Sequence, residues 1–397
     1  MINASDTNWI GERARQLGFA MCGVVRAEKF PELARNEEWL GRGYAGKMKY
    51  LGDSRRGDPQ RAMPGIGSVI VCALTYNTQH FRSTEAWAHM RGESEDEEPR
   101  GWISRYAWGD DYHEVLGAKL EALLEELRAQ YTGPFEARVY TDTGPINERV
   151  LAKHAGLGWL GKNTLLLNER LGSLFFLGLI LTTLDLQPTI GITESPAVDR
   201  CGSCRRCIDA CPTTALVGPY VMDARKCISY LTIELRGAIP EELREPMGQH
   251  IFGCDICQDV CPWNRNAPVT RAKEFEPRVY GRRSLETTTM EFRAGEAQEE
   301  DIGAIEMSSE SQKSLFLPHL EWLASMNEEE FRELFRGSPI KRTKWRGLIR
   351  NVCIALGNSK LAKGSARHER VSKLLSRLAT SDEPVIAESA QRAISRI

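Results

Sequence analysis

Hydrophobic and polar positions in the first half of the chain follow two different periods. Three short apolar runs, bounded by turn residues as buried strands are, lie at 19–25, 65–75 and 137–141. Three segments with apolar residues at helical spacing lie at 9–18, 112–131 and 146–155. This alternation of strands and helices predicts an α/β layer architecture for residues 1–190.

From Ser314 onward the pattern is helical throughout. Five short candidate helices with short links lie at 315–324, 327–335, 343–356, 369–378 and 384–397. They predict an all-α tail of the helical-repeat, HEAT-like kind, made of two imperfect units. Two polar, acid-rich stretches, 92–99 and 270–310, show little periodicity and are expected to be a solvated loop and a linker.

Composition and charge narrow the class of protein. The 397 residues are 42% hydrophobic and 27% charged, as in an ordinary globular protein. The net charge of -2 excludes a uniformly basic nucleic-acid-binding protein but allows a local basic patch. The N-terminus lacks the pattern of a secretory signal, and the most apolar stretch, 174–184, is shorter than the ~20 residues of a membrane span. We therefore expect a cytoplasmic monomer without a membrane partner.

Eight of the eleven cysteines lie between residues 201 and 261. In a reducing compartment such a group indicates metal binding rather than disulfides. The first run has the spacing C-x2-C-x2-C-x3-C-P of bacterial ferredoxins, in which the fourth cysteine ligates the other of two [4Fe–4S] clusters. The second run, C-x2-C-x3-C-P, lies 27 residues after an isolated cysteine, so the segment 228–253 is expected to loop out.

The ferredoxin spacing predicts a crossed assignment of ligands within a double-cluster domain at 191–270. One cluster takes Cys201, Cys204, Cys207 and Cys261, and the other takes Cys211, Cys227, Cys254 and Cys257. Paired all-cysteine zinc sites are the alternative, although two C-x3-C-P endings are rare in zinc ribbons. The remaining cysteines, Cys22, Cys72 and Cys353, have apolar neighbours and are expected to be inert core residues.

A double-cluster domain needs only part of this chain, so the 200 residues before it indicate a catalytic domain. Its most polar and glycine-dense part runs from Thr141 to Thr164. The glycines at 156, 158 and 161 match the dinucleotide fingerprint only superficially, because they follow a helix rather than a strand. They are either a structural turn or a place where the backbone approaches a large, flat ligand. Asp142 is either a helix N-cap or a general acid, and the residues alone favour the cap.

The chain resembles the epoxyqueuosine reductase family from about residue 10 into the helical tail. The resemblance is carried by the eight cysteines together with 104–107, 110–113, 141–145, 156–163, 230–234 and 261–265. The family is similar to reductive dehalogenases in its catalytic core and clusters. The resemblance implies that residues 1–190 bind cobalamin and that the protein reduces epoxyqueuosine to queuosine at the wobble position of tRNA, the last step of queuosine synthesis. It also implies an external electron donor, and it makes Asp142 the proton donor to the leaving oxygen.

Further site residues are predicted on the same basis. The expected contacts with cobalamin, or with the entry to its pocket, are Arg105, Tyr106, Asp142, Lys162, Asn163, Thr164, Ser229 and Tyr230. His113 and His154 are candidates for an axial cobalt ligand, but a lone histidine near a helix is more often structural.

The tail, 271–397, is predicted to bind the tRNA. Residues 338–378 contain eleven basic residues against one acid, Glu369. Five of the basic residues fall between Lys341 and Arg350, together with Trp345, and this asymmetry favours a phosphate-binding patch over a solvated helix face. Two other hypotheses remain open, namely a reductase of small molecules and an electron carrier without an active site.

Overall fold

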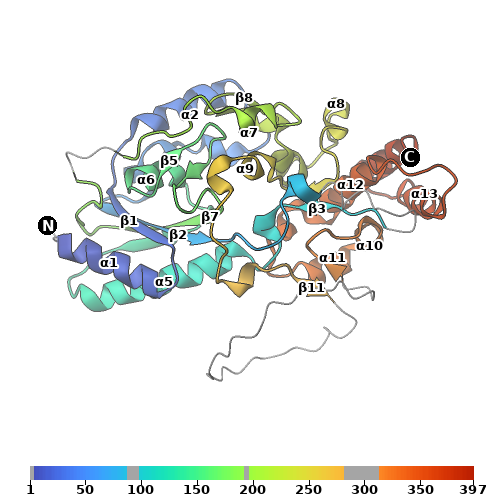
Figure 1. Cartoon of the computed structure of the whole chain (residues 1–397). Coiled ribbons are helices and arrows are strands. Elements are labelled where there is room, and N and C mark those ends of the chain that lie inside the picture. The colour runs from blue at the N-terminus through green and yellow to red at the C-terminus, as the bar shows by residue number, and fades with distance from the viewer. Residues whose placement is uncertain (1–3, 87–97, 192–195, 281–312) are drawn as a thin grey trace, which may run out of the picture.

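The computed structural model describes residues 4–86, 98–191, 196–280 and 313–397 (Figure 1). Most of the two polar stretches, 92–99 and 270–310, therefore lies outside the described residues. None of the helices in the described ranges is long and apolar enough to cross a membrane.

A four-stranded sheet forms the centre of the N-terminal half. Its strands are β1 (Met21–Arg26), β2 (Ser68–Thr75), β7 (Phe175–Thr182) and β4 (Ala137–Tyr140), in that spatial order. Every pairing is antiparallel, and β2 and β7 are paired along their full length, from Ser68 opposite Thr182 to Thr75 opposite Phe175. The three predicted strands and the helix–sheet layers are thus confirmed, whereas β7, inside the apolar stretch 174–184, was not predicted as a strand, and the sheet is antiparallel throughout.

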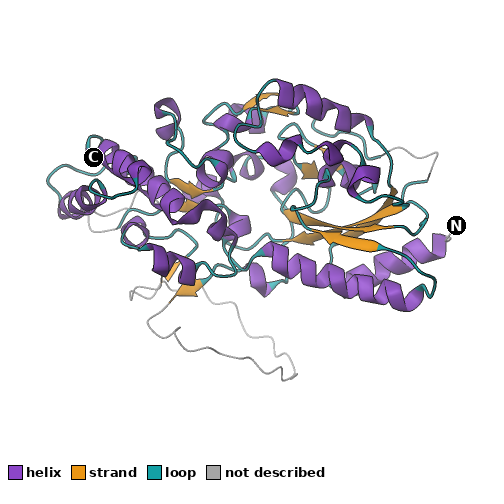
Figure 2. Ribbon diagram, turned by 180° about the vertical axis from the view of Figure 1, so that it is seen from behind, coloured by secondary structure: helices purple, strands orange, loops and turns teal. Residues whose placement is uncertain are grey.

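Helices cover both faces of this sheet (Figure 2). On one face lie α1 (Ala4–Gln16) and α5 (Tyr112–Gln130), and the leucines of α5 with Ile10 of α1 form one cluster with Ile70, Cys72 and Leu74. On the other face, α6 (Glu148–His154) packs against Val69, Val71 and Leu179. Since successive side chains of a strand point to opposite faces, burial on both sides explains why β2 is a continuous apolar run.

Short elements connect this core to the rest of the chain. The helices are α2 (Pro31–Gly41), α3 (Pro59–Ala62), α7 (Arg206–Asp209), α8 (Glu241–Arg244), α9 (Ile256–Asp259) and a π-helix, η5 (Tyr230–Glu234). The strands are β3 (Trp102–Ile103), β5 (Trp159–Leu160), β6 (Leu166–Leu167), β8 (Leu216–Gly218), β9 (Val221–Met222), β10 (His250–Phe252), β11 (Val279–Tyr280) and β12 (Lys313–Ser314). The 3₁₀ turns are η1 (Lys49–Gly52), η2 (Ser54–Gly57), η3 (Arg105–Ala107), η4 (Ala224–Lys226), η6 (Pro262–Asn264), η7 (Lys273–Phe275) and η8 (Pro339–Thr343).

The tail from Leu320 onward is helical, as predicted. Its helices are α10 (Leu320–Ala324), α11 (Glu328–Leu334), α12 (Lys344–Gly357), α13 (Ala366–Leu378) and α14 (Pro384–Ile394). The first of them starts five residues later than expected because Leu317, at φ 48°, precedes a proline, and proline disfavours a helical residue before it. The HEAT-like classification stays a prediction.

The tail shares a hydrophobic core with earlier parts of the chain. Trp102 and Trp108, together with Phe252 of β10, are buried in one cluster with residues of α10 to α14. Strands β3 and β10 pair in parallel beside this cluster. The division at residues 190 and 270 therefore stays a prediction, and the packing between the predicted parts is extensive.

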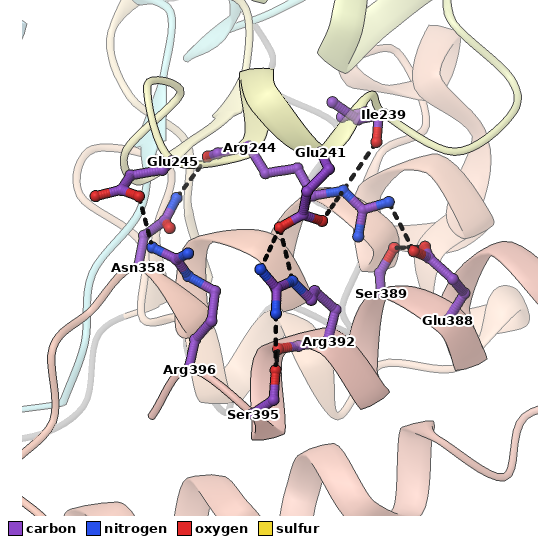
Figure 3. A network of polar contacts seen from close by, with 10 residues as sticks. All are labelled: Ile239, Glu241, Arg244, Glu245, Asn358, Glu388, Ser389, Arg392, Ser395 and Arg396. Atoms are coloured by element: carbon purple, nitrogen blue, oxygen red, sulfur yellow. Dashed lines mark hydrogen bonds and ion pairs between the residues drawn. The ribbon is translucent and has the colours of Figure 1, made fainter.

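A polar network joins α8 to the C-terminal helix (Figure 3). Arg392 of α14 pairs with Glu241, and Arg396 pairs with Glu245 at 3.1 Å. In the opposite direction Arg244 of α8 pairs with Glu388 at 2.7 Å, and its side chain is only 8% exposed. The network anchors the segment between Cys227 and Cys254, which the sequence predicted to loop out, on the end of the tail.

Candidate redox site

Four of the eight clustered cysteines surround one cavity. Cys201, Cys204, Cys207 and Cys261 line a space of about 300 Å³, together with Lys162 and Trp263. The first three come from the loop around α7, and Cys261 follows α9, 54 residues further along the chain. The cavity thus collects the set of thiols that the ferredoxin spacing assigned to one cluster.

The other four thiols lie near one another, with Cys257 in α9 itself. Burial and the charges of neighbouring thiols raise the pKa of Cys254 and Cys257 well above the usual value, and Cys227 acts on both. The charge of Cys211 contributes to the raised pKa values of Cys227 and Cys257. Cys207 of the first group also acts on Cys257, so the two groups are neighbours.

The thiols are surrounded by backbone N–H groups. The N–H of Ala215 donates to Sγ of Cys211 at 3.3 Å. Burial raises the pKa of Cys227, and the backbone N–H groups of Ser229 and Tyr230 oppose that rise. The buried indole N–H of Trp159 has no hydrogen-bond partner among the described residues, and it lies beside Cys201. Such donors favour thiolate over thiol, and therefore the site fits thiolate-bound clusters.

Within the described ranges, no three histidine, cysteine, aspartate or glutamate side chains converge on a position suited to one metal ion. The four thiols of the first group line one cavity together with seven other residues.

Lys162 and Asn163 contact the cysteine loops. Nζ of Lys162 donates to the carbonyls of Gly202 at 2.5 Å and Cys204 at 3.0 Å, and Nδ2 of Asn163 donates to the carbonyl of Cys257 at 3.4 Å. Both side chains are buried, so they brace the cluster loops. Thr164, at φ 67°, follows in the left-handed region and its carbonyl accepts a bond from Arg149 at 2.6 Å.

The local backbone requires glycine at positions 156 and 158. Gly156, at φ 85°, follows the C-terminus of α6, where a left-handed residue is common. A Cβ on Gly158 would lie 2.0 Å from the carbonyl oxygen of Leu167, which belongs to the facing strand of the β5–β6 hairpin. Gly156 and Gly158 thus have structural roles at a helix end and in a tight hairpin, and the approach of a large, flat ligand to this segment stays a prediction.

Asp142 lies at the end of β4 with an exposed carboxyl and a left-handed backbone, φ 57°. The hydroxyl of Tyr112 donates to its Oδ2 at 2.9 Å. Its own backbone N–H donates to Oε1 of Glu148 at 2.6 Å. The ring of Tyr112 is stacked on Phe176 at 4.3 Å, which fixes the direction of the hydroxyl.

Asp142 is not a helix cap. The N-cap of α6 is Asn147, whose side chain accepts from the N–H of Val150, so the alternative that the residues alone favoured for Asp142 is wrong. A left-handed non-glycine residue costs about 1 kcal/mol or more and persists where surrounding contacts impose it. Glu148 supplies such a contact. Burial, and then the charge of Asp142, raises the pKa of Glu148 to about 8.

Of the predicted cofactor contacts Tyr106 and Arg105, only Tyr106 interacts electrostatically with this carboxyl. Tyr106 packs edge-on against Tyr112, and burial followed by the charge of Asp142 raises its pKa well above the usual value. The guanidinium of Arg105 is buried and donates to four oxygens of residues 78–81, so it braces that loop. This geometry gives a cofactor contact by the Arg105 side chain no support.

Ser229 and Tyr230 follow Cys227 of the second cysteine group closely in sequence and lead into η5. Tyr230 begins the π-helix η5, a rare conformation that is frequent at functional sites. Its hydroxyl accepts from the N–H of Lys47 at 2.9 Å, and a Cβ on Gly46, at φ 59°, would lie 2.6 Å from that oxygen. The segment 46–57 is thereby held against η5.

The two candidate histidines pair with carboxylates. Nδ1 of His113 lies 2.7 Å from Oδ1 of Asp111, the N-cap residue of α5. Nε2 of His154 lies 3.1 Å from Glu32, and its ring stacks on Phe30. Such contacts are typical of structural histidines, so they favour the structural interpretation of His113 and His154 over that of an axial cobalt ligand.

The three other cysteines lie in the core as expected. Cys72 and Cys353 are fully buried, and Cys22 is partly buried opposite Cys72, with their Sγ atoms 3.6 Å apart.

Some of the basic residues predicted to form a patch on the tail are buried. Arg350 is fully buried and donates to the carbonyls of Leu231, Leu235 and Gly237, so its inclusion in an RNA-binding patch is wrong. Arg367 is buried as well. Four others pair with acids, and five are exposed without an ion pair among the described residues: Lys344, Lys360, Lys363, Lys373 and Arg377.

Sequence analysis missed two partners of Asp142 and a neighbouring ion pair. Tyr112 and Glu148 stand in the motifs quoted for the resemblance or next to them, but neither was singled out. Glu234 of η5 and Arg342 of η8 form a two-bond ion pair at 2.9 and 3.2 Å whose charges act on the same region. A local signal existed only for Glu148, six residues after Asp142 beyond a Gly-Pro turn.

Comparisons with known proteins agree with this geometry. A family model described as a 4Fe-4S double cluster binding domain matches residues 200–264, and one described as epoxyqueuosine reductase QueG matches residues 56–143. Epoxyqueuosine reductase of Pseudomonas aeruginosa is 38% identical over 88% of this chain and 84% of its own, and that of Gloeobacter violaceus is 40% identical over 88% and 95%. A crystal structure of epoxyqueuosine reductase with a tRNA-Tyr epoxyqueuosine-modified stem loop superimposes with a TM-score of 0.77 at 27% identity, covering 99% of this chain and 90% of that one.

Proposed function

This chain belongs to the epoxyqueuosine reductase family, and we propose that it reduces epoxyqueuosine to queuosine at the wobble position of tRNA, using cobalamin and two [4Fe–4S] clusters. The family makes it an oxidoreductase with a double-cluster domain. The observation that carries the rest of the proposal is the exposed carboxyl of Asp142, whose Oδ2 accepts from Tyr112 and whose backbone N–H donates to Glu148.

Asp142 is the proposed proton donor. Converting an epoxide to an alkene and water consumes two electrons and two protons, and the C–O bonds break as the oxygen gains negative charge. An acid at that oxygen neutralises the charge as it forms, which contributes roughly 10²–10⁴-fold to rate. Tyr112 orients the carboxyl through its bond to Oδ2, and Glu148 holds the backbone through its bond to the N–H.

Electrons are proposed to enter from an external donor through the clusters. Cys201, Cys204, Cys207 and Cys261 would hold one cluster, and Cys211, Cys227, Cys254 and Cys257 would hold the other. The shared cavity of the first four and the proximity of the second four support this crossed assignment. Cys227 precedes Ser229 and Tyr230, so the second cluster would lie on the side of Asp142.

Cobalamin would supply the reduced cobalt centre that delivers electrons to the epoxide. Tyr106, Ser229 and Tyr230 are the residues proposed to line its pocket, together with Asp142. The buried hydroxyl of Thr141, next to Asp142, has no hydrogen-bond partner among the described residues, and an unpaired buried polar group at this position fits a site that a cofactor completes.

The proposed partner is tRNA. A solved relative was crystallised with an epoxyqueuosine-modified stem loop, and the superposition covers 99% of this chain and 90% of that relative. The five exposed basic residues of the tail are the proposed phosphate contacts, because they carry charge that no acid among the described residues neutralises. A cytoplasmic monomer would suffice for this activity.

Spectra and metal analysis of anaerobically purified protein, reconstituted with cobalamin, test the proposal. About eight irons and one cobalt per chain, with absorption bands of both clusters and corrin, are expected. Zinc in place of iron would contradict the cluster assignment. Iron without corrin binding would contradict the cobalamin proposal and leave an electron carrier as the better description.

A further inference from the structure

Tyr50, in η1, is an aromatic side chain that remains exposed beside the proposed active site. Its relative exposure is 45%. The charges of Glu234, Arg342 and Asp142 all act on its phenol, so the ring lies within the same constellation as the proposed proton donor. Single-stranded RNA is commonly recognised by aromatic faces on which unstacked bases lie.

Two guanidinium groups from distant parts of the chain accompany this ring. Arg56 of η2 and Arg342 of η8 lie 5.7 and 5.8 Å from the ring centroid. Arg56 is held by bonds to the carbonyls of Tyr50 and Ile146, at 3.3 and 3.1 Å. The cluster therefore joins the N-terminal half to the tail beside the Asp142 loop.

Donor capacity remains at this cluster. Arg342 uses Nε and Nη2 for Glu234, its side chain is 52% exposed, and a guanidinium carries five N–H donors. The two guanidinium groups lie over the ring, and the part of the ring that stays exposed offers a surface to a base while the free N–H groups of Arg342 offer donors to a phosphate. The ion pair with Glu234 holds Arg342 in place, and the contacts of Tyr230 with residues 46–47 hold the segment that leads to Tyr50, so both are positioned before any ligand binds.

We propose that Tyr50, Arg56 and Arg342 form a subsite for a nucleotide adjacent to the modified one, with its base on the Tyr50 ring and its phosphate at Arg342. The inference rests on the proposed function, since it assigns a binding role beside the same reactive position. It gives Arg342 a task distinct from that of the exposed lysines on α12 and α13, which are farther along the tail. When the modified base is extruded into the active site, its neighbour loses a stacking partner, and Tyr50 would replace that partner.

The test uses the full-length, cluster-loaded protein and an unmodified anticodon stem–loop RNA with 2-aminopurine next to the wobble position. Binding is followed by fluorescence anisotropy and stacking by quenching of 2-aminopurine, so neither readout requires turnover. Tyr50→Ala should weaken binding by about fivefold or more and abolish the quenching, whereas Tyr50→Phe should retain both because stacking does not need the hydroxyl. Phe81→Ala, at a side chain of 47% exposure, is the matched control and should leave both unchanged.

The charge contribution is tested separately. Arg342→Ala should reduce the slope of log affinity against log salt by about 0.7, the value for one contact with a single-stranded phosphate. Arg392→Ala removes the same charge from the same tail, where Arg392 pairs with Glu241, and should leave the slope unchanged. Unchanged melting temperatures and cluster absorbance confirm that each variant is folded.

The outcomes separate this inference from the proposed function. Wild-type protein that binds the stem–loop without quenching, or Tyr50→Ala protein that binds and quenches as well as wild type, overturns the subsite alone. Wild-type protein that does not bind the stem–loop overturns the subsite and the tRNA substrate together.

Discussion

The carboxyl of Asp142 is positioned by side chains from two helices. Tyr112 opens α5 and Glu148 opens α6, and both reach the end of β4. The sequence showed Asp142 as a choice between cap and acid, because residue type and position relative to a helix suit both. The backbone geometry distinguishes the two roles. Asn147 is the N-cap residue of α6, and Asp142 has a left-handed backbone at φ 57°.

Glu148 should make stability depend on pH. Its pKa in the folded protein is about 8 against an ordinary 4.5, so between these values the unfolded state ionises while the folded state keeps its proton. The folded state is thus favoured below about pH 4.5 and progressively loses that contribution up to about pH 8. In Glu148→Gln the contribution is absent, although the amide oxygen can still accept from the N–H of Asp142. Melting temperatures from pH 5 to 8 should therefore fall more for wild type than for the variant, and parallel curves would refute this assignment.

Helices and strands could be predicted from the hydrophobic pattern of the sequence wherever burial is regular along the element. The run 65–75 is continuously apolar and the leucines of α5 repeat at about 3.6 residues, and these segments became β2 and α5 with small shifts of their ends. Strand pairing did not follow, because antiparallel neighbours such as β2 and β7 are far apart in sequence. The buried guanidinium of Arg350 was equally unpredictable, since the carbonyls that it satisfies belong to η5 and the turn after it, more than 110 residues earlier.

Arg350 tests whether α12 is a structural or an RNA-binding element. Arg350→Met removes donors to three carbonyls, at about 1–3 kcal/mol for each buried group left unpaired, so a loss of about 3 kcal/mol or more in unfolding free energy is expected. Lys344→Met, at the exposed start of the same helix, should change it by no more than about 0.5 kcal/mol. Chemical denaturation measures both. Weaker RNA binding by Arg350→Met with wild-type stability would instead restore the residue to the RNA-binding patch.

At the scale of the whole molecule, the cysteine region lies between the sheet domain and the tail and is fastened to both. Lys162 and Asn163 reach it from the N-terminal half, and the Figure 3 network holds its inserted segment on α14. The cysteine pattern could be interpreted from sequence because its spacing is short-range. The contacts that hold the cysteine region to the other two parts could not be predicted, because they join segments that only the fold brings together.

The crossed ligand assignment predicts which single substitutions share a phenotype. Cys204→Ala and Cys261→Ala should disturb the same cluster, although the residues are 57 positions apart, and Cys211→Ala should disturb the other. Electron paramagnetic resonance of the reduced proteins, with iron content, distinguishes the two signals. If Cys204→Ala and Cys211→Ala instead removed the same signal, the sequential rather than the crossed assignment would hold.

The most direct test of the central claim is a single-turnover assay of reduced, cobalamin-loaded protein with tRNA that carries epoxyqueuosine, in which queuosine is quantified by mass spectrometry of the nucleosides. Wild-type protein should form queuosine, and Asp142→Asn should form it roughly 10²–10⁴-fold more slowly with normal clusters, corrin binding and tRNA binding. No queuosine from the fully loaded wild-type protein would contradict the proposed activity, and an undiminished rate with Asp142→Asn would contradict the role of its carboxyl as the proton donor.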